Sequence, residues 1–347
     1  MQKNLFYLLM LALAVYLIYW TNGHLDSYDL GLLEQIGIFA ILALSYNLIN
    51  GVTGQFSLEP NGFVAIGAYM GALMTIPTET KIDMFALVDP APVILSMHGS
   101  FPMALIAGGV AAALVGLMLS FPVFRVRGDY LAIVTLGFGF IIRIFAQNQP
   151  AYTNGAMGLN DIPKDDAHIW LWIGGITIAT FVVMLHIIAS RYGRAMKAIR
   201  DDEDAAIAMG INTFAIKTTA FVTSAFFEGV GGALLASFLT TIAPDQFSFL
   251  LTFQLLIFVV IGGLGSMSGS LLATVGLMYL LEKLRFLDEE MDLFGMHMDA
   301  HPGMRMVIFS VLLVIVMLFA RTGLFGDKEI DEAVRKRLNN RSKGGQA

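Results

Sequence analysis

Residues 101–124 read FPMALIAGGVAAALVGLMLSFPVF, an apolar stretch without a single charged side chain. An α-helix needs about 20 such residues to cross the hydrocarbon core of a bilayer. The rest of the chain has a similar composition: 56% of its 347 residues are hydrophobic and 14% are charged, against roughly 25% charged in an ordinary soluble domain. The sequence therefore predicts an all-α fold, a polytopic transmembrane helical bundle.

Stretches of similar length recur along the chain. They lie near 4–20, 30–50, 56–76, 130–147, 168–190, 214–241 and 304–321. A longer stretch, 249–281, is cut by the glycine-rich run 262–269, and we expect two shorter passes there. A second glycine-bearing interruption is at 51–55. With the first stretch kept as an uncleaved helix, the sequence predicts about ten spans with two broken-helix regions.

The basic residues indicate how these spans are oriented. With ten spans, fifteen Lys and Arg residues fall on the side of the termini and five on the other side. The positive-inside rule therefore predicts that both termini are cytoplasmic. The net charge of −6 gives no sign of a nucleic-acid partner, and the absence of cysteine excludes disulfides and thiolate chemistry.

The longest charged interruption, 191–212, is predicted to be a cytoplasmic loop of two short helices. In the first, a basic residue recurs every third position, at Arg191, Arg194, Lys197 and Arg200. Such a stripe suits the anionic lipid headgroups of the inner leaflet. The second helix is expected to start at Asp201, with acids in its first turn, and to end at Gly210.

The second short helix carries small apolar residues, Ala205, Ala206 and Met209, that are expected to form one face. Such a face fits helix-in-groove docking to another protein, and a solvated loop is the alternative. The run Asp204-Ala205-Ala206, with Gly210 four residues after the second alanine, resembles the Glu-Ala-Ala-x-x-x-Gly coupling motif of ABC importer permeases, with Asp in place of Glu.

Five further blocks make the resemblance specific. They are 47–69, 128–139 (GDYLAIVTLGFG), 153–163 with TNGAMGL and Ile162-Pro163, 262–269 and 318–326. In this order, over roughly residues 30–326, the chain resembles the membrane subunit, M type, of branched-chain amino acid ABC importers. The resemblance implies a bacterial inner-membrane permease that works with a second permease, two ATP-binding subunits and a periplasmic substrate-binding protein.

The resemblance also implies how the chain is divided. Residues 1–326 would form a single permease domain that includes the coupling loop 191–212, and 327–347 a cytoplasmic tail. The residues expected to couple to the ATPase are Asp204, Ala205, Ala206, Met209 and Gly210. ATP and Mg would bind to the partner subunits, so no cofactor and no enzymatic activity are expected in this chain.

The cargo implied is a branched-chain or related amino acid. Urea or a short amide is an alternative, because urea importers resemble the same family, and an ATP-independent channel or ion-coupled transporter is another. Two departures bear on the cargo. Glu59-Pro60 stands where the family usually has Gly-His, and the acid Glu228 stands where a small residue is common.

Polar residues inside spans are costly and are therefore candidates for the substrate path. They are Asn47, Gln55, Glu59, Asn61, Thr135, Arg143, Glu228 and Gln254. Arg143 and Glu228 together offer groups for both charged ends of an amino acid. In the alternative interpretation, Arg143 extends to the outer surface and Glu228 pairs with another helix.

Metal, nucleotide and catalytic sites have no support in the sequence. The run 262–269 lacks the Gly-Lys-Ser/Thr of a phosphate loop. His297 and His301 have a metal-like spacing, but Pro302 makes a helical ligand pair doubtful, so no metal is assigned. No catalytic residues are assigned either.

Overall fold

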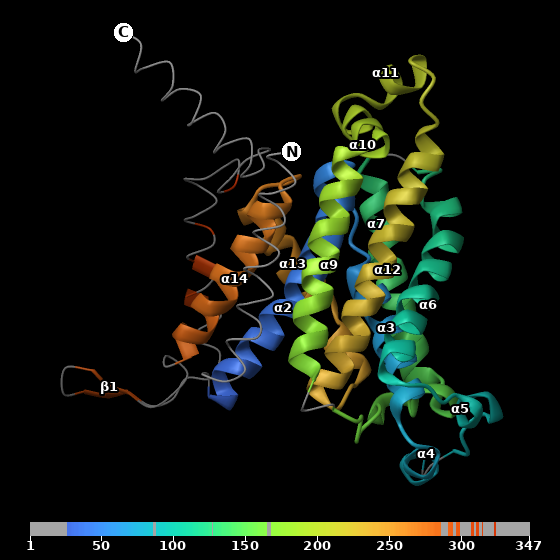
Figure 1. Cartoon of the computed structure of the whole chain (residues 1–347), viewed down its shortest axis with the longest axis vertical. Helices are drawn as coiled ribbons and strands as arrows, with labels where there is room; N and C mark the ends of the chain where they lie inside the picture. Colours follow the sequence, from blue (N-terminus) through green and yellow to red (C-terminus); the bar gives the residue numbers. More distant parts are fainter. Residues whose placement is uncertain are drawn as a thin grey trace.

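The computed structural model describes residues 26–85, 88–126, 128–164 and 168–285, two short strands and a few isolated positions between 307 and 323. In these parts the chain is helical apart from loops and one antiparallel hairpin. The helices form an elongated bundle (Figure 1). The predicted spans 4–20 and, but for a few positions, 304–321 lie outside the described residues.

The long helices are α2 (Ser27–Asn47), α6 (Phe101–Val123), α7 (Asp129–Asn148), α9 (Ile169–Ala189) and α12 (Thr213–Leu239). Shorter helices are α3 (Pro60–Thr75), α13 (Phe249–Gly262), α14 (Met267–Lys283), α10 (Arg191–Asp201) and α11 (Glu203–Ala208). A π-helical turn, η1 (Leu48–Val52), continues α2. The loops contain α4 (Thr78–Met84), α5 (Pro92–Ser96), α8 (Pro150–Thr153), η2 (Gly155–Met157) and η3 (Pro244–Phe247). The hairpin pairs β1 (Met291–Leu293) with β2 (Met296–Met298).

Five helices in the described parts are long and apolar enough to cross a membrane. They are Ser27–Val52, Phe101–Val123, Tyr130–Asn148, Ile169–Ala189 and Thr213–Leu239. The pair α13 and α14, bent by 119°, is a sixth candidate if it is counted as one broken span. The predicted membrane helices are thus confirmed in kind, whereas the described residues supply five or six spans rather than ten.

Both predicted interruptions are present. The first lies between η1 and α3, where residues 54–59 form irregular chain, and the second lies between α13 and α14. The stretch 56–76 was predicted to be one span, but helix α3 has only 16 residues. It starts at Pro60, because proline is favoured in the first turn of a helix, where its missing N–H needs no partner.

Helices α3, α6 and α12 pack through small residues in the middle of the bundle. A Cβ placed on Gly67 of α3 would lie 2.0 Å from the carbonyl oxygen of Gly229 in α12, and one on Gly71 would lie 2.6 Å from the Cβ of Ala233. Backbones approach this closely only where side chains are absent or small, which is the usual packing mode of membrane helices.

The two ends of the bundle carry different elements. Figure 1 shows α10 and α11 at one end and α4 and α5 at the opposite end, here called the α10 end and the α4 end. At the α4 end the ammonium group of Lys81 is buried and donates hydrogen bonds to the carbonyl oxygens of Met97 at 2.6 Å and Ile94 at 3.2 Å. Burial lowers the pKa of Lys81. This lysine therefore ties the loop between α3 and α6 together.

Candidate functional site

The charged interruption 191–212 folds as two short helices, as the charge pattern predicted. The hydroxyl of Ser190 caps the start of α10. Asp202 caps the start of α11 by accepting a hydrogen bond from the backbone N–H of Ala205 at 3.0 Å. Gly210 follows α11 at φ +83°, a conformation that glycine adopts without strain. Each helix end thus has a local cause in the sequence.

The residues predicted to couple to an ATPase do not share one face. Ala206 is buried, with 3% of its surface exposed. The other four are exposed: Asp204, Ala205, Met209 and Gly210. The predicted apolar face is therefore wrong for Ala206, because a six-residue helix that lies on the bundle must turn one side inward. Ile207, 45% exposed, was missed, although it is the largest apolar residue of α11.

Helix α11 is joined to α12 by an ion pair. The ammonium group of Lys217 lies 2.7 Å from the carboxylate of Glu203, and the lysine side chain is 5% exposed. Removing one partner of a buried pair leaves an uncompensated charge, which costs about 3–5 kcal/mol. This ion pair therefore joins α11 to the N-terminal part of α12.

Arg200 departs from the predicted basic stripe. Residues three apart on an α-helix differ by about 300° in direction, so the stripe turns by roughly half a circle between Arg191 and Arg200. Arg191 is exposed, whereas the guanidinium of Arg200 donates a hydrogen bond to the carbonyl oxygen of Gly51 at 3.2 Å. The prediction that all four basic residues face lipid headgroups is wrong for Arg200.

The Arg200 side chain touches both helix interruptions. A Cβ placed on Gly265, in the turn between α13 and α14, would lie 2.9 Å from Nη1 of Arg200 and 3.2 Å from the carbonyl oxygen of Gly51. A Cβ on Gly54 would lie 2.5 Å from Cγ of Arg200. These glycines leave open the space that the arginine occupies. We call Arg200, Gly51, Gly265 and Asn47 the α10-end junction.

Asn47, predicted to line the substrate path, holds this junction together. Its side-chain amide donates hydrogen bonds to the carbonyl oxygen of Ser266 at 3.0 Å and to the hydroxyl of Ser270 at 2.8 Å. Its side-chain oxygen accepts one from the N–H of Gly265 at 2.9 Å. Both donor hydrogens of Asn47 are thus used in joining α2 to the turn between α13 and α14.

The first interruption is held by side chains. The N–H of Ser57 donates to Oδ1 of Asn50 at 2.8 Å, and its carbonyl oxygen accepts from the hydroxyl of Tyr46 at 2.7 Å. The N–H of Leu58 donates to the hydroxyl of Thr135 at 2.9 Å. Non-helical backbone at membrane depth needs such partners. Thr135, another predicted path residue, therefore supports the chain here.

Three more predicted path residues have separate surroundings. Asn61 donates to the carbonyl oxygen of Phe247 and accepts from the hydroxyl of Thr252, both at 3.2 Å. Gln254 contacts the sulfur of Met278 at 3.7 Å, and Gln55 bonds only to the nearby backbone at 3.4 Å. The structure does not bring these residues together in one site.

Two acids are buried beside the first interruption. Glu59 and Glu228 are both 0% exposed. Glu59 is hydrogen-bonded to the hydroxyl of Ser57, and the hydroxyl of Ser224 lies 3.0 Å from Oε1 of Glu228. Glu59 directly precedes α3 and Glu228 lies within α12, so the acids stand where these two central helices meet.

Arg143 is not joined to Glu228. Its guanidinium is 2.5 Å from the carboxylate of Asp245, and Gln147 donates to the same carboxylate at 3.0 Å. Asp245 lies in η3, which follows the end of α12. Helix α11 precedes the start of α12, so Asp245 and α11 lie at opposite ends of that helix. The paired site for an amino acid predicted from Arg143 and Glu228 is therefore not assembled.

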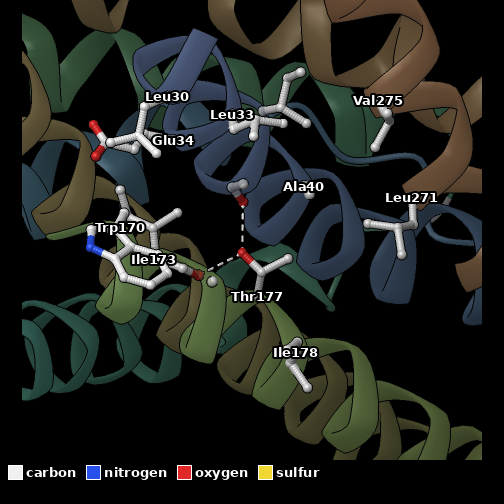
Figure 2. A pocket seen from close by; sticks show the side chains of 13 residues that line it. Leu30, Leu33, Glu34, Ala40, Trp170, Ile173, Thr177, Ile178, Leu271 and Val275 are labelled. Carbon is white, nitrogen blue, oxygen red and sulfur yellow. Dashed lines mark hydrogen bonds between the residues drawn. The ribbon is translucent and has the colours of Figure 1, made fainter. Parts of the chain in front are cut away.

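A groove of about 310 Å³ lies between α2, α9 and α14 (Figure 2). Its lining is largely apolar, with Leu33, Ile173 and Leu271 among the lining residues and Glu34 at one edge. None of the predicted path residues lines it. The groove offers few groups for the charged ends of an amino acid and is chemically suited to hydrocarbon. Across the described residues, no three His, Cys, Asp or Glu side chains are grouped to hold a metal ion.

Comparisons with known proteins agree with each other. The family described as the branched-chain amino acid transport system permease component matches residues 29–320. The chain is 30% identical over 378 residues to the high-affinity branched-chain amino acid transport system permease protein LivM of Escherichia coli (strain K12), covering 100% of this chain and 80% of the relative. No solved structure matches the chain.

More distant relatives have similar descriptions. The corresponding permease protein LivH of Salmonella typhimurium is 24% identical, with 85% of this chain and 93% of the relative covered. A probable branched-chain amino acid transport permease protein of Methanocaldococcus jannaschii is 20% identical, with coverages of 86% and 93%. The family match over most of the chain and the full-length similarity to LivM lead to one conclusion: this chain belongs to the family of branched-chain amino acid transport permeases, which are transport proteins and not enzymes.

Proposed function

We propose that this chain is a transmembrane subunit of a binding-protein-dependent ABC importer for branched-chain or related amino acids. ATP hydrolysis by partner subunits moves the segment α10–α11, and the bundle alternates between inward-open and outward-open states. The observation that carries this proposal is Arg200, which reaches from α10 to Gly51 and Gly265. One side chain thus connects the docking segment with both helix interruptions.

Movement of the docking segment has two routes into the bundle. Arg200 carries a displacement of α10 to α2 and to the turn between α13 and α14. The ion pair of Glu203 with Lys217 carries a displacement of α11 to α12. Because α12 packs on α3 and α6 in the middle of the bundle, both routes lead to the central helices.

The proposal implies an assembly. A second permease completes the pore, two ATP-binding subunits hold ATP and Mg, and a periplasmic substrate-binding protein delivers the cargo. The surface of α11 offered to an ATP-binding subunit consists of Asp204, Ala205, Ile207 and Met209. Exposed apolar side chains such as Met118 (72% exposed) and Leu250 (75% exposed) are left for membrane lipid or the second permease.

The proposed topology has ten spans and cytoplasmic termini in the bacterial inner membrane. Residues 1–326 form one permease domain and 327–347 a cytoplasmic tail. The placement of α10–α11 and of α4–α5 at opposite ends of the bundle supports this topology. The basic residues Arg191 and Arg194, exposed at the α10 end, suit the inner leaflet.

The proposed substrate path passes the two helix interruptions. Asn47, Asn61 and Thr135 shape it by holding backbone in place. Gln55 lies in the first interruption, and Gln254 lies within α13, where it contacts Met278 of α14. Arg143 stands at its outer end with Asp245. Because a binding protein selects the cargo, the permease needs no tight site of its own.

Reconstituted vesicles containing the complete transporter test the proposal. Ala205 is exposed on α11, so Ala205→Arg is expected to fold normally and to abolish ATP-dependent uptake of leucine. Val93→Arg, at an exposed site of the α4 end, is the matched control and should keep cytoplasmic coupling intact. Unchanged uptake by Ala205→Arg, or equal uptake by wild type without ATP, would contradict the ATP-driven mechanism and support a channel or ion-coupled transporter.

Calorimetry on the cognate binding protein tests the cargo. We expect tight binding of leucine or another amino acid and no binding of urea. Tight urea binding without amino acid binding would assign the chain to urea or short-amide import instead.

A further inference from the structure

Glu59 and Glu228 are buried acids in a largely apolar bundle, and neither side chain has any exposed surface. Glu59 is hydrogen-bonded to the hydroxyl of Ser57, whose carbonyl oxygen accepts a hydrogen bond from the hydroxyl of Tyr46. Glu228 lies 3.0 Å from the hydroxyl of Ser224, which lies 2.6 Å from the carbonyl oxygen of Ser45. Each acid is thus linked through one serine to neighbouring positions of α2, so the two acids face the same part of that helix.

The hydroxyl of Ser224 lies within hydrogen-bond distance of two oxygen atoms and can donate to only one of them. It lies 2.6 Å from the carbonyl oxygen of Ser45 and 3.0 Å from Oε1 of Glu228. A hydroxyl has one hydrogen to donate, and a carbonyl has none. If Ser224 donates to Ser45, its contact with Glu228 is a hydrogen bond only when the carboxyl group carries a proton.

One carboxyl oxygen of each acid lacks a positively charged partner among the described residues. Oε1 of Glu59 and Oε2 of Glu228 are buried without a hydrogen-bond partner among the described residues. Tyr46 is the titratable group that α2 turns toward them, and its hydroxyl already donates to the backbone of Ser57. Helices α6 and α13 contain no charged residue.

The cations of α7 and α12 have other partners, and the guanidinium of Arg200 in α10 donates to the carbonyl oxygen of Gly51. Arg143 of α7 is paired with Asp245, and Lys217 of α12 is paired with Glu203. Lys217 is eleven positions from Glu228 on the same helix, which is about 16 Å. An ionised carboxylate buried without such a partner costs several kcal/mol, so two negative charges at this place are strongly disfavoured.

We propose that Glu59 and Glu228 form a proton-binding site at the contact of α3 and α12. The site holds at least one proton, which lies on Glu228 and is donated to Ser224. Loss of the proton removes this hydrogen bond and places two like charges between the central helices. Proton occupancy therefore favours the closely packed arrangement of α3 and α12.

A proton fits this chemistry better than a metal ion or an ammonium group. Calcium takes six to eight oxygen ligands, and no third His, Cys, Asp or Glu joins this pair in the described parts of the chain. An amino acid would also bring a carboxylate, for which the surrounding helices offer no free cation. A proton needs no ligands beyond the two carboxyl groups.

Infrared spectroscopy of the purified chain in lipid nanodiscs detects the proton directly. At neutral pH, wild type is expected to show the C=O absorption band of a protonated carboxylic acid. This band should shift when the sample is transferred to heavy water. The double variant Glu59→Gln with Glu228→Gln should lose it. Glu34→Gln is the control, because Glu34 is also buried, with 5% of its surface exposed, but lies 3.5 Å from Lys164, and it should keep the band. No difference between wild type and the double variant would overturn the proposal.

Thermal unfolding gives a second readout. The unfolded chain releases these protons near pH ~4.3, whereas the folded pair keeps one, so the melting temperature of wild type should fall as the pH rises into the alkaline range. The double variant should lack this fall. If sodium, calcium or leucine instead raised the melting temperature of wild type but not of the variants, the site would bind that ligand and the proposal would be wrong. Neither measurement depends on transport, so a negative result for the proton-binding site would leave the proposed function unaffected.

Discussion

The two helix interruptions are built in opposite ways. Between η1 and α3 the chain is irregular, and its backbone groups are bonded by side chains of three helices: Tyr46, Asn50 and Thr135. Between α13 and α14 the chain turns within a few residues, with Gly263 at φ +109° and Gly265 at φ +90°. The first interruption depends on several bonding side chains, whereas the second depends on glycines that leave room for the turn and on one side chain, Asn47.

At the α10-end junction both interruptions lie close to the docking segment α10–α11. Arg200 can reach both interruptions because Gly51 and Gly265 lie against each other without side chains. Substitutions that add atoms at the junction should therefore be most damaging, and those that remove a single bond from the segment between η1 and α3 should be mildest.

The largest effect is expected for Gly51→Ala. The added Cβ would lie 1.9 Å from Oδ1 of Asn47 and 2.2 Å from the backbone nitrogen of Gly265. Such an overlap cannot be relieved by rotating a side chain, so we expect a loss of more than about 3 kcal/mol in the free energy of unfolding. Melting temperature and the yield of monodisperse protein are the measurements. Gly137→Ala, with no heavy atom within 4 Å of the new Cβ, is the control and should be neutral or slightly stabilising.

A smaller loss is expected for Asn47→Ala. It leaves the N–H of Gly265 without its acceptor and removes the bonds to Ser266 and Ser270, at a cost of about 2–4 kcal/mol in the free energy of unfolding. Asn50→Ala acts on the interruption between η1 and α3 and should cost only about 1–2 kcal/mol, because Tyr46 still bonds the carbonyl oxygen of Ser57. Chemical denaturation of both variants measures the two losses in the free energy of unfolding. A larger loss for Asn50→Ala than for Asn47→Ala would contradict the comparison of the two interruptions.

The smallest effect is expected for Thr135→Val. The shape is kept, but the N–H of Leu58 loses its acceptor, so about 1 kcal/mol of stability should be lost. Thr180→Val is a matched control, since the Thr180 hydroxyl is buried without a hydrogen-bond partner in the described structure. It should leave the melting temperature unchanged or raise it. Equal losses for the two variants would show that the bond to Leu58 contributes nothing.

The sequence predicted the long helices well and the interruptions only in part. The predicted stretch 101–124 became Phe101–Val123, because an uncharged stretch of this length has one stable state in a membrane. The predicted stretch 56–76 included irregular chain, because apolar composition does not distinguish a helix from a loop whose backbone is bonded by side chains. Gly54 and Pro60 were the available signals.

The site residues were harder to predict than the helices. Asn47 and Thr135 were selected as polar groups inside spans, yet their hydrogen bonds join elements that no spacing rule connects. Arg200 was assigned to lipid because its direction on the helix was not followed through three steps. The meeting of Glu59 with Glu228 depends on how α3 packs against α12, which local patterns do not determine.

The coupling of ATP hydrolysis to uptake in Arg200→Ala tests the account most directly. Reconstituted transporter with this variant should keep its melting temperature and hydrolyse ATP, while uptake per ATP falls roughly tenfold, equivalent to about 1.4 kcal/mol of coupling free energy. Arg191→Ala, at an exposed position of the same helix, should retain the wild-type ratio. A wild-type ratio in Arg200→Ala would contradict the claim that this side chain connects the docking segment with the two interruptions.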